Sequence, residues 1–282
     1  MDLTSVKTIK ELLLKYNARP SKKMGQSFLI NKSALKKIVE TAQLTPQDII
    51  LEIGPGIGTL TKELAEKAKK VIAIEKDGKM VEILKKTLEN CRNVKIIHND
   101  ILKISNFKCS LRDALRVKQI SNYKVVANIP YYLTSPLIRK CLESEKKPDE
   151  MILMVQKEVA QRICSKPPDM SLLSVSVQFY AQAKIFAYIS KECFWPRPKV
   201  ESAIIKISNI KNQKSKIFIE KFFKVVRAGF SHPRKQLANN LSKSLEKDKN
   251  EINLWLLKNN IDPKRRAETL GIEDWINLTK NS

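Results

Sequence analysis

Glycines and carboxylates follow three candidate strands in the first 100 residues, and together they could bind an adenosine-containing cofactor. Gly54 and Gly56 lie in the run LEIGPGIG at 51–58, where glycine permits a sharp turn close to a ligand. Glu75 ends the next apolar run, where a carboxylate can meet a ribose diol, and Asp100 ends the third, where it can accept from an adenine amino group. The spacing is GxGxG, which favours S-adenosylmethionine over NAD because no pyrophosphate has to be cradled.

The segment Asn128-Ile129-Pro130-Tyr131 suits methyl transfer to an exocyclic amino group of a base. The lone pair of that nitrogen is delocalised, so hydrogen bonds to the Asn128 oxygen and to the backbone carbonyl of Ile129 or Pro130 would favour a reactive pyramidal nitrogen. Pro130 keeps the loop rigid, and Tyr131 offers a face for an unstacked base. The methyl donor is already activated, so positioning supplies the rate and no metal is needed. The segment resembles the N/D-P/I/L-P-Y/F/W motif of amino-directed methyltransferases.

Short apolar runs alternate with helical patterns over most of the chain, which predicts a parallel sheet covered on both faces. The expected strands are 49–53, 71–74, 94–97, 124–129, 151–155, 184–189 and 202–207. The expected helices before residue 170 are 4–16, 35–42, 59–69, 77–88, 135–142 and 157–164. The segment 191–199 is too short for a helical crossover, so the last two strands should be antiparallel. Seven strands with the last reversed predict the α/β fold of a class I (Rossmann-like) methyltransferase.

Strand patterns end after residue 208, where a basic linker at 211–216 precedes a helical region. Helices are expected at 218–228, 234–247, 252–258 and 272–278. We therefore expect a cofactor-binding catalytic domain at 1–209 and a small all-α domain at 210–282.

The charge balance indicates a polyanionic partner. The chain has 53 Lys+Arg against 29 Asp+Glu, a formal net charge of +24. This favours nucleic acid over an anionic membrane surface, and no apolar run is long enough for a membrane span. Five scattered cysteines without a CxxC pair and only two histidines predict no metal site and a reducing cytoplasm.

Three further segments resemble the ribosomal RNA adenine N6,N6-dimethyltransferases of the small subunit. KKMGQSFL at 22–29 is similar to K-x-x-G-Q-N/H-F-L, and LMVQKEVAQR at 153–162 is similar to L-Q-K-E-V-A-x-R. FWPRPKVESA at 194–203 is similar to F-x-P-x-P-K-V-x-S-A. The resemblance extends from about residue 20 to about residue 275.

This resemblance implies roles for residues outside the glycine turn. Gln26, Ser27 and Leu29 match the family segment that lies over the cofactor, although Ser27 stands where Asn or His is usual. Phe194 is implied to pack on the target adenine opposite Tyr131. The alternative for Phe194 is a core anchor before the last strand.

The C-terminal region carries a candidate RNA contact. The run FSHPRKQ at 230–236 resembles the family's F-x-x-R-R-K segment, with Pro233 in place of one Arg. We expect Arg234 and Lys235 at the start of a helix, where they would contact phosphates without reading bases.

The resemblance implies dimethylation of two adjacent adenines in the 3′-terminal hairpin of small-subunit ribosomal RNA, within an immature subunit. A cytoplasmic monomer is expected. One alternative is the large-subunit adenine methyltransferase of the macrolide-resistance type, which shares the glycine turn and the Asn-Ile-Pro-Tyr loop. A second alternative is a non-catalytic RNA-binding assembly factor that keeps the fold.

Overall fold

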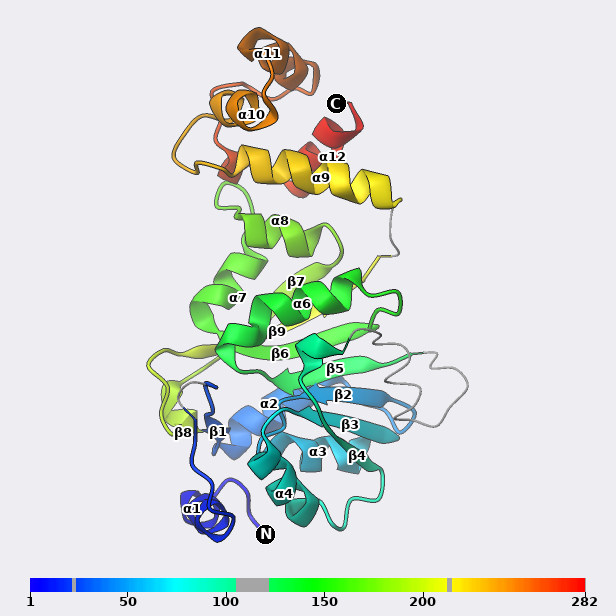
Figure 1. Cartoon of the computed structure of the whole chain (residues 1–282), viewed down its shortest axis with the longest axis vertical. Coiled ribbons are helices and arrows are strands. Elements are labelled where there is room, and N and C mark those ends of the chain that lie inside the picture. Colours follow the sequence, from blue (N-terminus) through cyan, green and yellow to red (C-terminus); the bar gives the residue numbers. More distant parts are fainter. Residues whose placement is uncertain (22–23, 105–121, 212–214, 282) are drawn as a thin grey trace. The chain divides into compact units, whose positions relative to one another are not determined.

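The computed structural model describes residues 1–21, 24–104, 122–211 and 215–281 (Figure 1). Lys22, Lys23 and part of the expected linker at 211–216 lie outside the described residues. The chain divides into two compact units, of which the first comprises 1–160 and 184–210 and the second comprises 161–183 and 211–282. Residues 161–183 thus pack with the second unit, although they precede the boundary expected near residue 210.

A seven-stranded sheet forms the centre of the first unit, in the order β4-β3-β2-β5-β6-β9-β7 (Figure 1). The parallel strands are β2 (Ile49–Ile53), β3 (Lys70–Glu75), β4 (Val94–His98), β5 (Lys124–Asn128) and β6 (Glu150–Gln156). Strand β9 (Ser202–Ser208) runs antiparallel to β6, and β7 (Gln182–Ile189) is the edge strand beside β9. The expected class I methyltransferase sheet with a reversed last strand is confirmed.

Amphipathic helices alternate with these strands along the chain and bury their apolar faces. The helices are α1 (Val6–Lys15), α2 (Lys32–Ala42), α3 (Thr59–Lys67), α4 (Gly78–Thr87), α6 (Thr134–Glu143) and α7 (Lys157–Cys164). Apolar side chains of α2 and α3 share one core cluster with Val126 of β5 and Ile204 of β9. Helix α1 packs elsewhere, with Phe28 and Ile57 beside the glycine turn.

A second, two-stranded sheet was not expected from the sequence. Strand β1 (Phe28–Leu29) pairs antiparallel with β8 (Phe194–Trp195), in the register Phe28 to Trp195 and Leu29 to Phe194. Strands of two residues carry no hydrophobic periodicity, so local patterns do not reveal them. The pairing joins two of the segments on which the family resemblance depends.

The second unit is helical, with α8 (Leu172–Gln178), α9 (Lys216–Gly229), α10 (Leu237–Leu245), α11 (Lys249–Lys258) and α12 (Ile272–Lys280). Phe179 stacks on Phe222 with ring centroids 4.0 Å apart, which ties the end of α8 to α9. Trp275 of α12 is fully buried and lies where any side chain at Gly229 would stand. Within the described parts of the chain, no helix is both long and apolar enough to cross a membrane.

The expected helix start at residue 234 is wrong. Helix α10 begins at Leu237, so Arg234 and Lys235 lie in the turn before it. The Lys235 N–H donates to the His232 carbonyl over 3.0 Å, and Pro233 occupies the second position of this turn. Proline favours that turn position because its φ is already fixed near the required value.

Candidate active site

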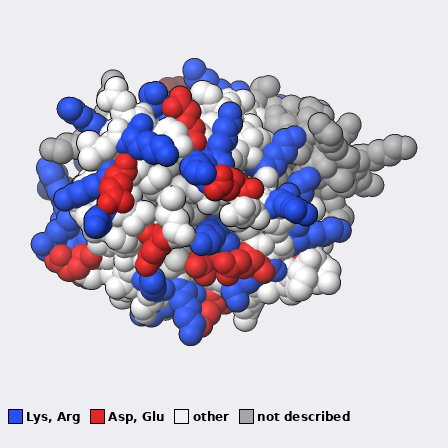
Figure 2. Space-filling view, turned by 90° about the horizontal axis from the view of Figure 1, so that it is seen from below, with Lys and Arg blue, Asp and Glu red and all other residues white. Residues whose placement is uncertain are grey.

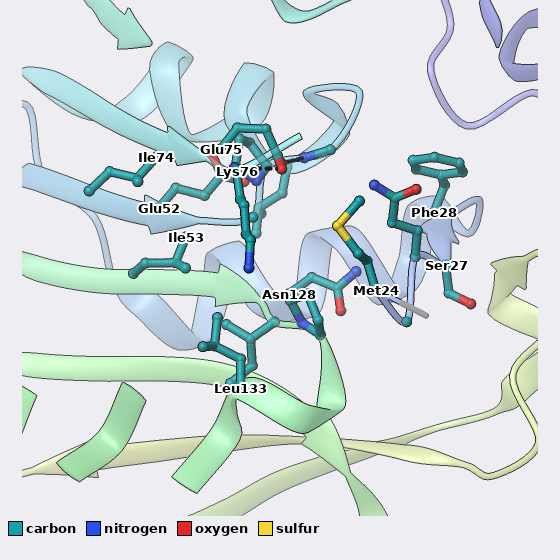
Figure 3. Close-up of a pocket in the computed structure, with 18 of the residues that line it drawn as sticks. Met24, Ser27, Phe28, Glu52, Ile53, Ile74, Glu75, Lys76, Asn128 and Leu133 are labelled. Atoms are coloured by element: carbon teal, nitrogen blue, oxygen red, sulfur yellow. Dashed lines mark hydrogen bonds between the residues drawn. The ribbon is translucent and has the colours of Figure 1, made fainter. Parts of the chain in front are cut away.

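One pocket in the first unit brings together all the site residues expected there. It opens at the carboxyl ends of the parallel strands, the usual ligand-binding edge of such a sheet (Figure 3). Its lining includes Gln26, Ser27, Leu29, Gly54, Gly56, Glu75, Asp100, Asn128, Pro130, Tyr131 and Phe194. Segments at the carboxyl ends of β2, β3, β4 and β5 and residues of the β1–β8 pair therefore share one cavity.

The glycine turn after β2 depends on residues without a Cβ atom. Gly54 and Gly56 have φ angles of +68° and +61°, in the left-handed region. A Cβ atom on Gly54 would lie 3.3 Å from Cδ of Pro130, and one on Gly56 would lie 3.4 Å from the Phe28 ring. The turn can therefore approach both the Asn-Ile-Pro-Tyr loop and β1, which leaves a narrow cradle for a ligand.

Glu75 holds the glycine turn through hydrogen bonds to its carboxylate. One oxygen accepts from the Gly56 N–H over 3.1 Å, and the other accepts from the N–H groups of Lys76 and Asp77 over 2.8 and 2.9 Å. The side chain is buried, and this burial raises the pKa of the carboxyl, while the three N–H donors oppose the rise. Carboxylate oxygens can accept more than one hydrogen bond each, so capacity for a ribose diol remains.

Asp100 is held at the end of β4 by a lysine that the sequence analysis did not single out. Nζ of Lys76 lies 2.9 Å from the Asp100 carboxylate, whose other oxygen accepts from the Leu102 N–H over 3.0 Å. The hydrogen bond from Lys76 lowers the pKa of Asp100, so this carboxylate stays an ionised acceptor. Figure 3 shows the Lys76 side chain extending into the space between Glu75 and Asn128.

The Asn-Ile-Pro-Tyr segment forms the wall opposite the glycine turn. Asn128 ends β5 and faces the pocket (Figure 3), and a 3₁₀ turn at Tyr131–Leu133 follows. The Pro130 carbonyl already accepts from the Leu133 N–H over 2.9 Å. The Tyr131 hydroxyl lies 3.0 Å from Oγ of Ser202 at the start of β9, and burial raises the pKa of this hydroxyl. The hydrogen bond therefore holds the Tyr131 ring in place, and the raised pKa keeps its hydroxyl protonated.

The β1–β8 pair places the remaining pocket residues. The Ser27 hydroxyl donates to the Pro196 carbonyl over 2.7 Å. Gln26 donates to the Asp77 carboxylate over 2.9 Å and so reaches the start of α4. Phe194 is only 4% exposed and belongs to the core cluster, yet it also lines the pocket. Phe194 is therefore both a core residue before the last strand and part of the pocket wall.

Glu52 is a pocket residue that the sequence analysis missed. It lies in β2 with a relative exposure of 1%, and burial raises the pKa of its carboxyl to about 8. The sequence does contain a signal for Glu52, because it is the only acidic residue in the otherwise apolar run 49–53 and must therefore be buried with its strand. The group is uncharged over most of the neutral pH range, because a buried carboxylate without a cation is costly.

The surface of the molecule carries the excess of positive charge that the sequence shows, whereas the described residues form no candidate metal site. Figure 2 shows Lys and Arg side chains spread over one face of the molecule, with Asp and Glu among them, as expected for a chain of net charge +24. Arg234 and Lys235 belong to the second unit. Among the residues that the structure describes, no group of three or more His, Cys, Asp or Glu could hold a metal ion.

Comparisons with known proteins agree with this geometry. The model of the family "Ribosomal RNA adenine dimethylase" matches residues 17–281. Proteins named "Ribosomal RNA small subunit methyltransferase A" are similar over almost their whole length: that of Dehalococcoides mccartyi strain CBDB1 is 42% identical over 95% of this chain and 90% of its own. That of Geobacillus kaustophilus is 40% identical over 99% of this chain and 96% of its own.

Two solved structures share the fold. A dimethyladenosine transferase from Plasmodium falciparum is 27% identical, with a TM-score of 0.72 over 89% of this chain and 95% of that one. The 23S rRNA methyltransferase ErmE has a TM-score of 0.70 over 90% and 98% at 23% identity, which supports the fold alone. From the family match and the relatives above 40% identity, the chain belongs to the ribosomal RNA adenine dimethylase family.

Proposed function

We propose that the chain transfers methyl groups from S-adenosylmethionine to the N6 amino groups of two adjacent adenines in the 3′-terminal hairpin of small-subunit ribosomal RNA. One observation carries this proposal: the glycine turn with Glu75 and Asp100 shares a single pocket with Asn128 and Tyr131. A donor-binding half and an acceptor-binding half therefore face each other. The names of the relatives support the small subunit as the source of the RNA.

The donor half fits an adenosyl cofactor. Gly54 and Gly56 leave a cradle that a Cβ atom would narrow, Glu75 offers acceptors for the ribose, and ionised Asp100 offers an acceptor for the adenine amino group. Gln26, Ser27 and Leu29 would close this half from the β1 side. When bound, S-adenosylmethionine supplies an activated methyl group on a sulfonium centre.

The acceptor half would position the target amino group. The Asn128 oxygen accepts one N–H of the adenine, and a backbone carbonyl at Ile129 or Pro130 accepts the other. The fixed φ of Pro130 holds these two acceptors at a constant separation. Tyr131 supports the flipped base, with Phe194 as the proposed second wall. After the first methyl transfer one N–H remains, so a single acceptor such as Asn128 can still orient the nitrogen.

The helical region at 210–282 is proposed to bind RNA and the region at 1–209 to carry catalysis. Arg234 and Lys235 in the turn before α10 would contact phosphates, which positions the RNA without reading its bases. We place the reaction in the cytoplasm, with the chain acting as a monomer on an immature small subunit.

Methyl transfer from labelled S-adenosylmethionine tests this proposal. Unmodified small subunits, unmodified large-subunit RNA and a control RNA are each incubated with the protein, and the products are identified as nucleosides. Dimethyladenosine from small subunits alone is expected. Product from large-subunit RNA alone would assign the chain to the macrolide-resistance type, and no product with intact cofactor binding would favour a binding factor.

Variants of two asparagines, Asn128 in the pocket and Asn90 outside it, show whether the activity in this assay depends on the candidate site. Asn128→Ala should lower kcat by about 100-fold or more, the scale for losing one positioned hydrogen-bonding group, while Asn128→Asp keeps an acceptor and should retain part of the activity. Asn90→Ala, at an exposed asparagine after α4, is the matched control and should behave like the parent. Full activity in Asn128→Ala would contradict the assigned role.

A further inference from the structure

The edge strand β7 exposes aromatic rings on one face. Along β7, exposed and half-buried residues alternate, so Lys184, Phe186 and Tyr188 share the solvent face. On the other face, Ala187 and Ile189 pack against the core cluster. Phe186 is 49% exposed and Tyr188 is 51% exposed, although aromatic side chains gain most of their stabilisation from burial. Exposed rings on an edge strand favour aggregation, so their presence calls for a partner.

Each of these rings has a lysine beside it. Nζ of Lys184 lies 5.6 Å from the Phe186 ring centroid, and Nζ of Lys157 lies 5.3 Å from the Tyr188 ring centroid. Lysine side chains alone would protect an edge strand from pairing with another chain, and this protection does not need aromatic rings between the lysines. The alternation of a cation with an aromatic face is instead what a single nucleic-acid strand binds, through phosphates and stacked bases.

This surface is continuous with the wall of the candidate active site. Lys157, beside Tyr188, forms an ion pair of 2.7 Å with Glu201 and donates its backbone N–H to the Glu201 carbonyl over 3.0 Å. The next residue, Ser202, lies 3.0 Å from the Tyr131 hydroxyl. A short chain of contacts therefore leads from the β7 face to the ring proposed to hold the target base.

The ring spacing favours unpaired RNA over a duplex. Residues two apart on a strand are about 6.6 Å apart, roughly twice the ~3.4 Å step of a stacked strand. Two bases could each lie on one ring only if the strand between them is unstacked. RNA beside an adenine that has been extruded into a pocket meets this condition.

We propose that the solvent face of β7, formed by Lys184, Phe186 and Tyr188, binds two unpaired nucleotides of the RNA next to the target adenine. The bases stack on Phe186 and Tyr188, and the lysines contact the phosphates. This inference rests on the proposed function, because it takes the substrate to be RNA that enters the pocket beside Tyr131.

Leucine variants test the rings without removing apolar surface. Phe186→Leu and Tyr188→Leu should each weaken binding of the 3′-terminal small-subunit RNA by about tenfold, and the double variant on the order of a hundredfold. Tyr188→Phe keeps the aromatic face and should bind like the parent. Leu14→Ala, at an 80% exposed leucine on α1, is the control for loss of an exposed apolar side chain. Cofactor affinity and Tm should stay at the parent values in every variant.

Ultraviolet crosslinking of the bound RNA provides a direct readout. The parent should give a crosslinked peptide that contains residues 184–189, and the double leucine variant should not. Parent-like RNA affinity in the double variant would overturn this inference and leave the proposed function intact. Normal binding of free RNA with weak binding of the assembled subunit would assign the surface to a protein instead. A parent chain that bound cofactor but no RNA would overturn both proposals.

Discussion

The Ser27 hydroxyl donates a hydrogen bond to the Pro196 carbonyl over 2.7 Å, across 169 positions of the sequence. This bond lies beside the pairing of Phe28 with Trp195 and closes one end of the two-stranded sheet, whose other pair is Leu29 with Phe194. The Ser27 side chain fixes the position of the Phe194 segment at the pocket wall.

Ser27→Ala should therefore loosen that wall. A lost hydrogen bond of this kind is worth about 0.5–1.5 kcal/mol, so we expect kcat/KM for RNA methylation to fall about fivefold. Ser176→Ala removes a hydroxyl that bonds only within α8 and should leave kcat/KM at the parent value. An unchanged kcat/KM in Ser27→Ala would show that the backbone pairing alone holds Phe194.

Glu75→Gln should damage cofactor binding and stability together. The amide presents an NH₂ group to backbone N–H donors that now share a carboxylate, which costs about 1–3 kcal/mol in the free energy of unfolding. We also expect cofactor affinity to fall at least about tenfold, because one ribose acceptor is lost. Calorimetric titration and thermal unfolding measure the two effects, with the exposed α4 variant Glu82→Gln as control. Cofactor affinity within twofold of the parent would remove Glu75 from the ribose site.

Glu52 should make stability fall as pH rises. Its pKa is about 8 in the native chain against an ordinary value of 4.5, so between these values the native state holds a proton that the unfolded state has released. The free energy of unfolding then decreases by up to about 1.4 kcal/mol for each pH unit in that window.

The Glu52→Gln variant isolates this effect, because glutamine resembles the protonated acid at every pH. The difference in free energy of unfolding between variant and parent should grow in favour of the variant from pH 5 to pH 8. Glu66→Gln, at an exposed position on α3, should follow the parent at each pH. A constant difference between Glu52→Gln and parent over this range would contradict the raised pKa.

The turn before α10 should contribute to RNA affinity through charge alone. The double variant Arg234→Ala with Lys235→Ala should reduce the slope of log K against log salt by about 1–2, because two fewer phosphates are neutralised. Affinity for control RNA should fall as much as affinity for the substrate. Lys216→Ala, at an exposed lysine paired with Glu220, provides the comparison. An unchanged salt slope would exclude phosphate contacts by this turn.

Local patterns were enough to predict the sheet and most of the pocket. The apolar run at 49–53 became β2 and the helical pattern at 157–164 became α7, both with the expected bounds. Gly54, Glu75, Asp100 and Asn128 could be predicted to meet because the carboxyl ends of parallel strands lie at one edge of a sheet. The residue type and its position at the end of a strand are enough to predict that these side chains meet.

Other features depend on neighbours distant in the sequence. The β1–β8 pair, the Ser27–Pro196 bond and the Lys76–Asp100 ion pair each join segments that no local pattern connects. The pKa of Glu52 is raised because the folded chain excludes water from it, which its position in an apolar run only hints at. The sequence by itself thus determined the fold class, the glycine turn and the position of the Asn-Ile-Pro-Tyr segment at the end of a strand. Only the tertiary structure decided how their side chains are held and charged, because hydrogen bonding and desolvation are set by what surrounds each group in space.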